Sequence, residues 1–359
     1  MSTTISDFHV IRPEFELDQE ESVKWLAAIH TEASKDPERH DTFLAVLRKI
    51  GLGEQKIQKR GVSINDCFHR DWNSMEIYHA LTKPEGAGFG KRSEFFDRVA
   101  SDVMARFYPE NFPIPAHLVH VTCTGYVAPS PAQKLVSMRK AGYETMITHA
   151  YHMGCYASIP ALRIAKGYAE PVDIVHTEIC SLHLNPDLHD MSQLIVQTLF
   201  ADGFIKYTVS PSEKPGFRIL KLDERIIPES TDSMHWKCHD WGLKMKLEKD
   251  VPVLIARAIP SFVDKLLADV KSGRDIYFAI HPGGPKIIQQ VGAILELKPE
   301  QFAHSLWVLQ NYGNMSSATL PHVWERLWKD QTVENGSYVV SLAFGPGLTL
   351  AGGVFECVR

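Results

Sequence analysis

The sequence has 359 residues, of which 44% are hydrophobic, and this is typical of a globular protein long enough for two domain-sized units. The formal net charge of −5 argues against a nucleic-acid surface, and no apolar run approaches the length of a membrane span. The amino terminus lacks a signal-peptide pattern, so we expect a cytoplasmic protein. Six scattered cysteines favour reduced thiols over a disulfide framework.

The first predicted element is an amphipathic helix over residues 20–29. Two later segments look like ligand-binding motifs but do not meet the requirements. Residues 86–91 read GAGFGK, without the preceding glycine or the following serine or threonine of a phosphate-binding loop. Residues 235–239 contain His235, Cys238 and His239, but no second pair at zinc-finger spacing follows. We therefore predict neither a metal nor a bound cofactor.

Cys155 has the most informative surroundings in the sequence. A β-leaning stretch at residues 144–151 leads to Gly154, which allows a sharp turn, and residues 159–166 favour a helix with proline in its first turn. A helix amino terminus presents free N–H groups and a positive dipole, which favour a thiolate. The alternative is a buried structural cysteine. The strand, glycine, cysteine and helix order favours a nucleophile.

His281 follows the next informative strand, at residues 275–280, and precedes PGGP. Functional groups gather at the carboxyl ends of strands in open α/β folds, and the glycines allow close approach to the backbone. A core histidine satisfied by backbone groups is the alternative. Asn314 lies in a turn rich in glycine and asparagine that precedes a helix. Its amide can donate to a developing oxyanion, or it can simply cap the helix.

At this point the sequence resembles the type III polyketide synthases, the chalcone-synthase-like branch of the thiolase-fold condensing enzymes. The resemblance rests on four segments in the family's order, and it extends over about residues 40–359. They are GCYA at 154–157, HPGGP at 281–285, YGNMSS at 312–317 and FGPGLT at 344–349. A fifth segment, LFADG at 199–203, resembles the motif that contains the family's gatekeeping phenylalanine, here Phe200. Phe200 can also be an ordinary core aromatic.

The resemblance implies an α/β thiolase fold with two similar βαβαβαββ halves in five αβαβα layers, assembled as a homodimer. We expect an N-terminal helical segment at residues 1–40, a half with the nucleophilic cysteine at 41–215, and a half with the histidine and asparagine at 216–359. The turn-rich segment 211–216 supports a boundary there. The two halves show no duplicated sequence pattern.

The resemblance also implies decarboxylative condensation, with Cys155, His281 and Asn314 as the catalytic residues. Cys155 accepts an acyl starter from coenzyme A or an acyl carrier protein. His281 keeps Cys155 ionised, and with Asn314 it holds the enolate formed when a malonyl thioester loses carbon dioxide. The Cys155 N–H and the turn at 344–347 form a second oxyanion hole. Iterated condensation and cyclisation would follow.

Departures from the plant chalcone synthases affect the expected substrate. Met245 stands where those enzymes have a second gatekeeping phenylalanine, and Cys123, Cys180 and His183 match cavity-lining threonines. These changes alter the volume and polarity of the pocket. We therefore expect fatty acyl starters and an alkylpyrone or resorcinol-type product. Further substrate-binding residues are expected in the two C-terminal motifs: Ser316, Gly345 and Gly347.

Two questions stay open at the level of sequence. A group of basic residues either meets coenzyme A phosphates or a carrier protein, or forms a solvated helix face: Arg48, Lys49, Lys56, Lys59 and Arg60.

The alternatives to iterative synthesis are a single-condensation ketosynthase, such as a ketoacyl synthase III or a chain-joining pyrone synthase, and a noncatalytic carrier-protein-binding protein. The complete catalytic set argues against the noncatalytic alternative.

Overall fold

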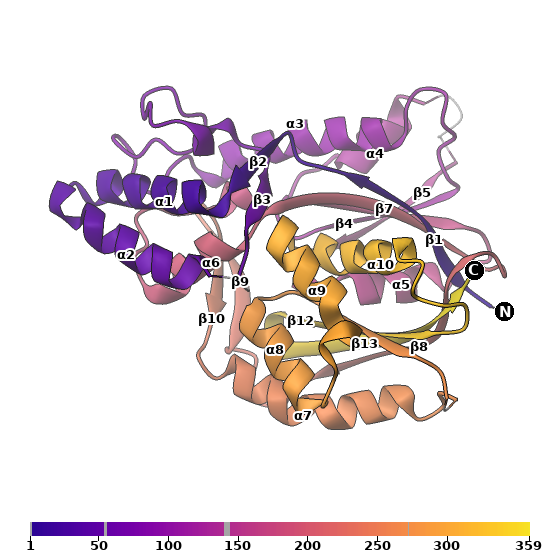
Figure 1. Cartoon of the computed structure of the whole chain (residues 1–359). Coiled ribbons are helices and arrows are strands. Elements are labelled where there is room, and N and C mark those ends of the chain that lie inside the picture. Colours follow the sequence, from indigo (N-terminus) through magenta and orange to yellow (C-terminus); the bar gives the residue numbers. More distant parts are fainter. Residues whose placement is uncertain (1, 54–55, 140–143, 272) are drawn as a thin grey trace.

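The structure is a computed structural model that describes residues 2–53, 56–139, 144–271 and 273–359 (Figure 1). Its centre is a nine-stranded mixed sheet in the order β11-β12-β13-β8-β1-β7-β6-β4-β5. The strands of this sheet are β1 (Thr4–Ile11), β4 (His117–Thr122), β5 (Met146–Tyr151), β6 (Val172–Ile179), β7 (Asp202–Ser210), β8 (Gly216–Ile226), β11 (Ile276–Ile280), β12 (Tyr338–Gly345) and β13 (Thr349–Val358).

The sheet consists of two halves with equivalent topology. Strands β4, β6, β7 and β1 lie side by side in the N-terminal half, and β11, β12, β13 and β8 repeat this order in the C-terminal half. In each half the first pair is parallel and the next two pairs are antiparallel. The halves join through two residue pairs of β1 and β8, Thr4 with Arg218 and Ile5 with Phe217.

The structure confirms the predicted thiolase fold and differs from the predicted strand count in one place. In the described chain the C-terminal half contributes four strands to the main sheet, because helices follow β11 where the N-terminal half has β5. The halves share a topology without a visible sequence repeat, since burial can be preserved by many apolar sequences.

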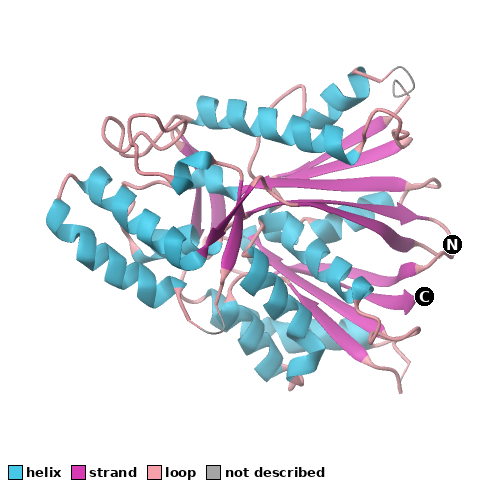
Figure 2. Ribbon diagram, turned by 45° about the horizontal axis from the view of Figure 1, so that its top comes forward, coloured by secondary structure: helices cyan, strands magenta, loops and turns pink. Residues whose placement is uncertain are grey.

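Ten helices accompany the sheet in the described chain. Helices α5 and α10 pack between the two halves, α3 and α4 cover the outer face of the N-terminal half, and α7 and α8 cover the outer face of the C-terminal half (Figure 2). The helices are α1 (Gln19–Ser34), α2 (His40–Gly51), α3 (Phe89–Phe107), α4 (Pro131–Ser137), α5 (Ser158–Ala165), α6 (Met191–Leu199), α7 (Val251–Leu267), α8 (Pro285–Ile294), α9 (Pro299–Tyr312) and α10 (Thr319–Lys329).

Two antiparallel strand pairs stand outside the main sheet: β2 (Phe15–Asp18) with β3 (Lys59–Val62), and the hairpin of β9 (Met234–His239) with β10 (Gly242–Leu247). The predicted N-terminal helix is present as α1, which begins at Gln19. The first forty residues are not purely helical, however, because β1 and β2 precede α1. Strand β1 occupies the centre of the sheet, where each half provides one of its neighbours.

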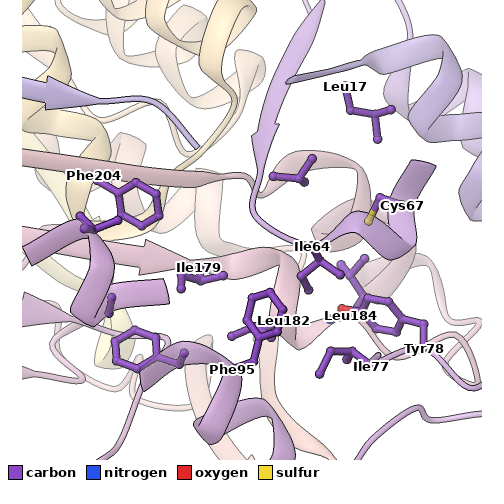
Figure 3. Close-up of a cluster of buried hydrophobic side chains, with 14 of the residues drawn as sticks. Leu17, Ile64, Cys67, Ile77, Tyr78, Phe95, Ile179, Leu182, Leu184 and Phe204 are labelled. Atoms are coloured by element: carbon purple, nitrogen blue, oxygen red, sulfur yellow. Dashed lines mark hydrogen bonds between the residues drawn. The ribbon is translucent and has the colours of Figure 1, made fainter. Parts of the chain in front are cut away.

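A buried apolar cluster attaches the N-terminal segments to the sheet (Figure 3). It joins Leu17 of β2, Phe95 of α3 and Ile179 of β6 to Phe204 of β7. Complete burial of such side chains contributes about 1.5–3 kcal/mol each. The pair of β2 and β3 is also held against the end of α6, because Arg60 of β3 donates to the carbonyls of Gln197 and Phe200.

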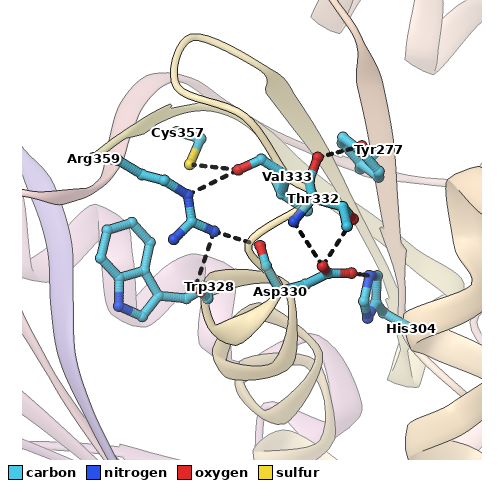
Figure 4. A network of polar contacts seen from close by, with 8 residues as sticks. All are labelled: Tyr277, His304, Trp328, Asp330, Thr332, Val333, Cys357 and Arg359. Atoms are coloured by element: carbon cyan, nitrogen blue, oxygen red, sulfur yellow. Dashed lines mark hydrogen bonds and ion pairs between the residues drawn. The ribbon is translucent and has the colours of Figure 1, made fainter.

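The carboxyl terminus is held by a polar network (Figure 4). Arg359 donates to the carbonyls of Trp328 (3.0 Å) and Val333 (2.8 Å). The Asp330 carboxylate accepts from Thr332 and pairs with His304 at 3.1 Å. These contacts fix the loop between α10 and β12, so that α10 keeps its place between the halves.

Candidate active site

Cys155 lies in a short turn between β5 and α5. The turn is the 3-10 helix η3 (Gly154–Tyr156), and α5 begins three residues after Cys155, at Ser158. Gly154 has a φ of +79°, and a Cβ at this position would lie 2.2 Å from Cδ of Pro346. Only glycine combines this backbone conformation with such close approach. The predicted strand, turn and helix are therefore present, with an additional 3-10 turn.

Cys155, His281 and Asn314 all line one cavity of about 150 Å³. They come from η3, the end of β11 and the loop after α9, so both halves contribute. Most of the remaining lining is apolar, and Glu248 is the carboxylate among the lining residues. The structure thus brings together the three residues predicted to be catalytic.

The His281 imidazole is buried and faces this cavity without a hydrogen-bond partner. Its backbone N–H donates to the Leu342 carbonyl at 2.7 Å, which continues the pairing of β11 with β12. In the described part of the chain, neither ring nitrogen has a partner. Burial lowers the pKa of His281 to about 3, so the ring is neutral near pH 7. A neutral imidazole with free nitrogens is available to a ligand in the cavity.

The Asn314 side chain is oriented by its own turn. Its Oδ1 accepts from the backbone N–H of Ser316 at 3.0 Å and from the hydroxyl of Thr319 at 3.3 Å. The amide nitrogen remains as the donor, Asn314 and Cys155 line the same cavity, and the Asn314 side chain acts to lower the pKa of Cys155. Asn314 is not the cap of α10, because Ala318 occupies that position. The site therefore contains an amide donor beside the sulfur.

The Cys155 thiol is neutral in the unliganded cavity. Burial raises its pKa to about 12, and this outweighs the opposite effect of the Ser316 and Asn314 side chains, which favour the thiolate. The Sγ atom lies 4.0 Å from Oγ of Ser316, whose φ of +50° is unusual for a residue other than glycine. The thiolate expected from a helix amino terminus is therefore not the resting form, because desolvation dominates.

The predicted substrate-binding residues fall into two groups. Phe200 and Met245 line the cavity of about 150 Å³ and also a second hollow of about 20 Å³. Cys123, Cys180 and Ser316 line the second hollow, which Cys155 also borders. Phe200 and Met245 therefore lie between two spaces that meet at the sulfur.

His183, Gly345 and Gly347 line neither space. His183 accepts from the Leu243 N–H at Nδ1 (3.2 Å), so its Nε2–H donates to the Thr124 carbonyl (2.8 Å). It thus holds the hairpin of β9 and β10 and adds no free imidazole to the pocket. Gly345 packs on Tyr156, where a Cβ would lie 2.3 Å from the ring. Gly347 supplies a φ of +70° to the turn.

Glu178 is an important residue that the sequence analysis missed. Its fully buried carboxylate accepts from the Cys123 N–H (3.0 Å), the Thr124 hydroxyl (2.8 Å), and both the N–H and hydroxyl of Ser317. Burial raises the pKa of Glu178. Its charge in turn raises the pKa of Cys155. The signal available in the sequence was a glutamate near the end of the strand VDIVHTEI, all of whose residues are buried in the structure.

The basic residues predicted to meet phosphates do not form one surface. Arg60 is buried, Lys59 pairs with Glu16 at 2.9 Å, and Arg48 lies 3.8 Å from Glu20. Lys56 differs, because burial and the charge of Lys286 both lower its pKa. Lys286 is next to Ile287 in α8, which lines the cavity. Lys286 therefore neighbours a residue of the cavity lining, and its charge acts on Lys56, whose ammonium donates to the Lys49 and Ile50 carbonyls at 2.8 Å.

Other features of the described chain do not compete with this site. A hollow of about 640 Å³ lies between β2 and α3 and includes none of the predicted site residues. No cluster of three or more histidine, cysteine or acidic side chains suits a metal ion within the described ranges. The described helices include none that is sufficiently long and apolar to cross a membrane.

Comparisons with known proteins show what the chain is similar to. Residues 219–359 match the family of chalcone and stilbene synthases, C-terminal domain. The chain is 32% identical over 253 residues to probable polyketide synthase 1 of Dictyostelium discoideum, which covers 66% of this chain. The chain spans about 8% of the length of that relative.

Three solved structures share the fold over nearly the whole chain. The C-terminal type III polyketide synthase domain of Steely1, a type I/III hybrid from Dictyostelium, has a TM-score of 0.84, 24% identity and 100% coverage of both chains. PKS-I from the brown alga Ectocarpus siliculosus has a TM-score of 0.83 and 23% sequence identity, and the match covers 99% of this chain and 98% of that one. The 1,3,6,8-tetrahydroxynaphthalene synthase of Streptomyces coelicolor A3(2) has a TM-score of 0.81 and 23% sequence identity, and the match covers 99% of each chain. The chain therefore has the thiolase fold of these three structures, and its residues 219–359 are similar to the C-terminal domain of the chalcone and stilbene synthases.

Proposed function

We propose that the protein is an acyltransferase that extends an acyl starter by decarboxylative condensation with malonyl thioesters. The observation that carries this proposal is the His281 imidazole, which has no partner in the described chain and faces the same apolar cavity as Cys155 and Asn314. Two donors beside a buried nucleophile suit a reaction in which negative charge develops on a thioester oxygen.

In the first step the Cys155 sulfur attacks the carbonyl carbon of the starter thioester. The neutral thiol transfers its proton through His281 to the departing thiol, so that an acyl-enzyme and a free carrier thiol result. The Cys155 N–H and the turn at 344–347 hold the tetrahedral oxyanion. Gly347 provides the positive φ that this turn requires.

In the second step a malonyl thioester occupies the cavity and its carbon–carbon bond breaks to release carbon dioxide. The electron pair becomes an enolate, whose oxygen accepts hydrogen bonds from His281 and the Asn314 amide. The enolate carbon then attacks the Cys155 thioester, forms a carbon–carbon bond and releases the sulfur. Each oriented donor contributes about 3–4 kcal/mol to this step. Repetition and cyclisation complete the product.

The lining supports an aliphatic starter, and we propose an alkylpyrone or resorcinol-type product. The cavity side chains include Leu199, Met234, Met245 and Ile255. Its volume of about 150 Å³ corresponds to roughly five water molecules. A long chain therefore has to displace side chains, and Met245, with its flexible thioether, is the one best placed to move.

The small volume also favours a second candidate, a ketosynthase that makes a single carbon–carbon bond with carrier-bound substrates. The hollow on the other side of Phe200 and Met245 holds only about 20 Å³, which leaves little room for repeated extension. Product mass separates the two candidates, because a single condensation adds one two-carbon unit and iterative synthesis adds several.

Delivery, assembly and compartment are further parts of the proposal. Lys56 and Lys286 can meet the phosphates of coenzyme A or of a carrier-protein prosthetic group. Three exposed apolar side chains near the edge strand β5 support a homodimer: Tyr126, Met138 and Met146. All six cysteines are unpaired, which supports a reducing compartment, and we propose the cytoplasm.

The proposed function is tested by mass spectrometry with malonyl-CoA and acyl-CoA starters from acetyl to palmitoyl. Cys238 is the exposed cysteine, so a Cys238→Ser background removes nonspecific acylation. We expect acyl mass on Cys155 and extended products, both abolished by Cys155→Ala. Acylation without extended product would contradict synthesis from coenzyme A thioesters, and carrier-bound malonyl groups would be the next substrates. Absence of acylation with every carrier would favour a noncatalytic protein.

A further inference from the structure

Arg60 is a buried cation next to the active site, not a surface residue that meets phosphates. It lies in β3 with 5% of its surface exposed. Its Nη1 donates to the carbonyls of Phe200 (2.7 Å) and Gln197 (2.8 Å), and its Nη2 donates to the Ser22 hydroxyl. Burial lowers the pKa of Arg60 to about 10, so the guanidinium stays charged at neutral pH.

The segment that Arg60 contacts is paired directly with the Asn314 loop. Phe200 and Asn314 form an isolated parallel β-bridge. In this bridge the Asn314 N–H donates to the Leu199 carbonyl at 3.1 Å, and the Ala201 N–H donates to the Asn314 carbonyl at 2.8 Å. The backbone positions of Phe200 and Asn314 are therefore coupled, and Arg60 holds the Phe200 side of the pair.

Arg60 also contacts the Asn314 side of this bridge. A Cβ at Gly313 would lie 3.2 Å from Cγ of Arg60, 3.3 Å from the Leu199 carbonyl and 3.0 Å from Cβ of Ala201. Gly313 has a φ of +74° and directly precedes Asn314. The Arg60 stem thus packs against the turn that carries the amide donor, while its head group binds the segment that carries Phe200.

We propose that Arg60 is a positioning residue that sets the placement of Phe200 and Asn314 relative to Cys155. This inference rests on the proposed function. A charged donor with two carbonyl acceptors holds the segment more rigidly than a neutral one, because charge-assisted hydrogen bonds are about twice as strong. Small displacements of an oriented donor cost large factors in rate. Arg60 acts through the backbone and does not touch the reacting atoms.

Two reactions of the same sample test the proposal. In the proposed mechanism, acyl loading uses Cys155, His281 and the turn at 344–347, whereas decarboxylation of a malonyl thioester also uses the Asn314 amide. In Arg60→Met we expect decarboxylation per loaded site to fall about 10- to 100-fold, with loading changed less than about threefold. Arg60→Lys retains the charge and reaches one carbonyl, so it should recover part of the loss. Ser22→Ala removes only the Nη2 contact and serves as the matched control.

The outcomes separate a positioning role from a structural one. Loss of folded protein in Arg60→Met lowers both reactions in the same proportion, and normalisation to the acylated fraction removes this effect. An unchanged ratio of decarboxylation to loading in Arg60→Met, or an equal drop in Ser22→Ala, would overturn the inference. Absence of decarboxylation in the unmodified protein would instead count against the proposed function.

Discussion

Gly154 and Pro346 are in such close contact that a Cβ on Gly154 would lie 2.2 Å from the proline Cδ. Gly154 begins the nucleophile turn of the N-terminal half, and Pro346 begins the 3-10 turn η6 (Pro346–Leu348) of the C-terminal half. This contact places Cys155 at the boundary of the two halves. The position of the sulfur therefore depends on how the halves pack.

Replacing Gly154 by alanine should misplace the nucleophile. The φ of +79° costs an alanine about 1–2 kcal/mol, and the contact with Pro346 adds to this. We expect Gly154→Ala to load acyl groups on Cys155 at least tenfold more slowly, measured by intact mass against time. Gly273→Ala is the control, since Gly273 has a similar φ of +83° but open space around its Cβ and lines neither space at the active site. Equal effects in the two variants would rule out the Pro346 contact as the cause.

Asn314→Asp should separate the donor role of Asn314 from its structural role. Aspartate keeps the Oδ1 that accepts from Ser316 and Thr319, but it replaces the amide donor by negative charge. Decarboxylation of malonyl-CoA should slow by at least about a hundredfold, because one oriented donor contributes this factor. Asn311→Ala is the control, since its amide donates within α9 to the Trp307 carbonyl. Retained decarboxylation in Asn314→Asp would refute the donor role.

The resting thiol should show the reactivity of a neutral group. With the pKa of Cys155 raised to about 12, its thiolate fraction grows tenfold per pH unit between pH 7 and 9. Alkylation by iodoacetamide in the Cys238→Ser background should therefore accelerate about tenfold per pH unit without a plateau. Peptide mass spectrometry locates the modification. A rate independent of pH over this range would indicate a thiolate and imidazolium pair.

Glu178→Gln should affect stability and thiol reactivity in opposite directions. The amide nitrogen of glutamine would face donors from Cys123, Thr124 and Ser317, which leaves buried groups unsatisfied and costs about 1–3 kcal/mol. Loss of the charge also lowers the pKa of Cys155, so alkylation at a given pH becomes faster.

Urea unfolding and alkylation rates of the same sample measure the two effects of Glu178→Gln. The control is Asp173→Asn, a second buried carboxylate of β6, which accepts from Tyr108 and Thr208. It should lower stability without accelerating alkylation. Slower alkylation in Glu178→Gln would contradict the assigned electrostatic effect.

Acid should destabilise the fold because several histidines are buried in neutral form. Burial lowers the pKa to about 4 for His30 and to about 3 for His120, His183, His281 and His322. Below pH 6.5 these histidines are protonated in the unfolded chain but stay neutral in the folded protein. The free energy of unfolding therefore decreases by about 1.4 kcal/mol for each histidine and each unit by which the pH is lowered. Asp202, whose pKa burial raises to about 6, acts in the opposite direction.

The net expectation is a lower urea midpoint at pH 5.5 than at pH 8, since these five histidines and His176, whose pKa burial also lowers, outnumber the two buried carboxyls with raised pKa, Asp202 and Glu178. The midpoint is followed by circular dichroism with constant ionic strength. His69→Gln is a suitable control, because His69 is not fully buried and its loss should leave the pH dependence in place. A midpoint independent of pH would refute the linkage.

The sequence by itself determined the local geometry around the reacting groups. Gly154 and Cys155 between a strand and a helix, His281 after a strand, and Asn314 in a glycine-rich turn were all predicted, and the structure brings the three side chains to one cavity. These features depend on neighbouring residues: glycine permits the positive φ, and proline marks the first turn of a helix. The family motifs, which are also local, were sufficient to predict the thiolase fold.

Tertiary structure alone decided the features that depend on residues far apart in the chain. Burial by both halves makes Cys155 and His281 neutral, although the local sequence favoured a thiolate. Arg60 looked like a surface cation until its contact with Phe200 was known, and His183 looked like a pocket residue until its contacts with Thr124 and Leu243 were known. The physical reason is that desolvation and hydrogen-bond pairing depend on the whole packed surroundings, whereas backbone conformation depends mainly on adjacent residues.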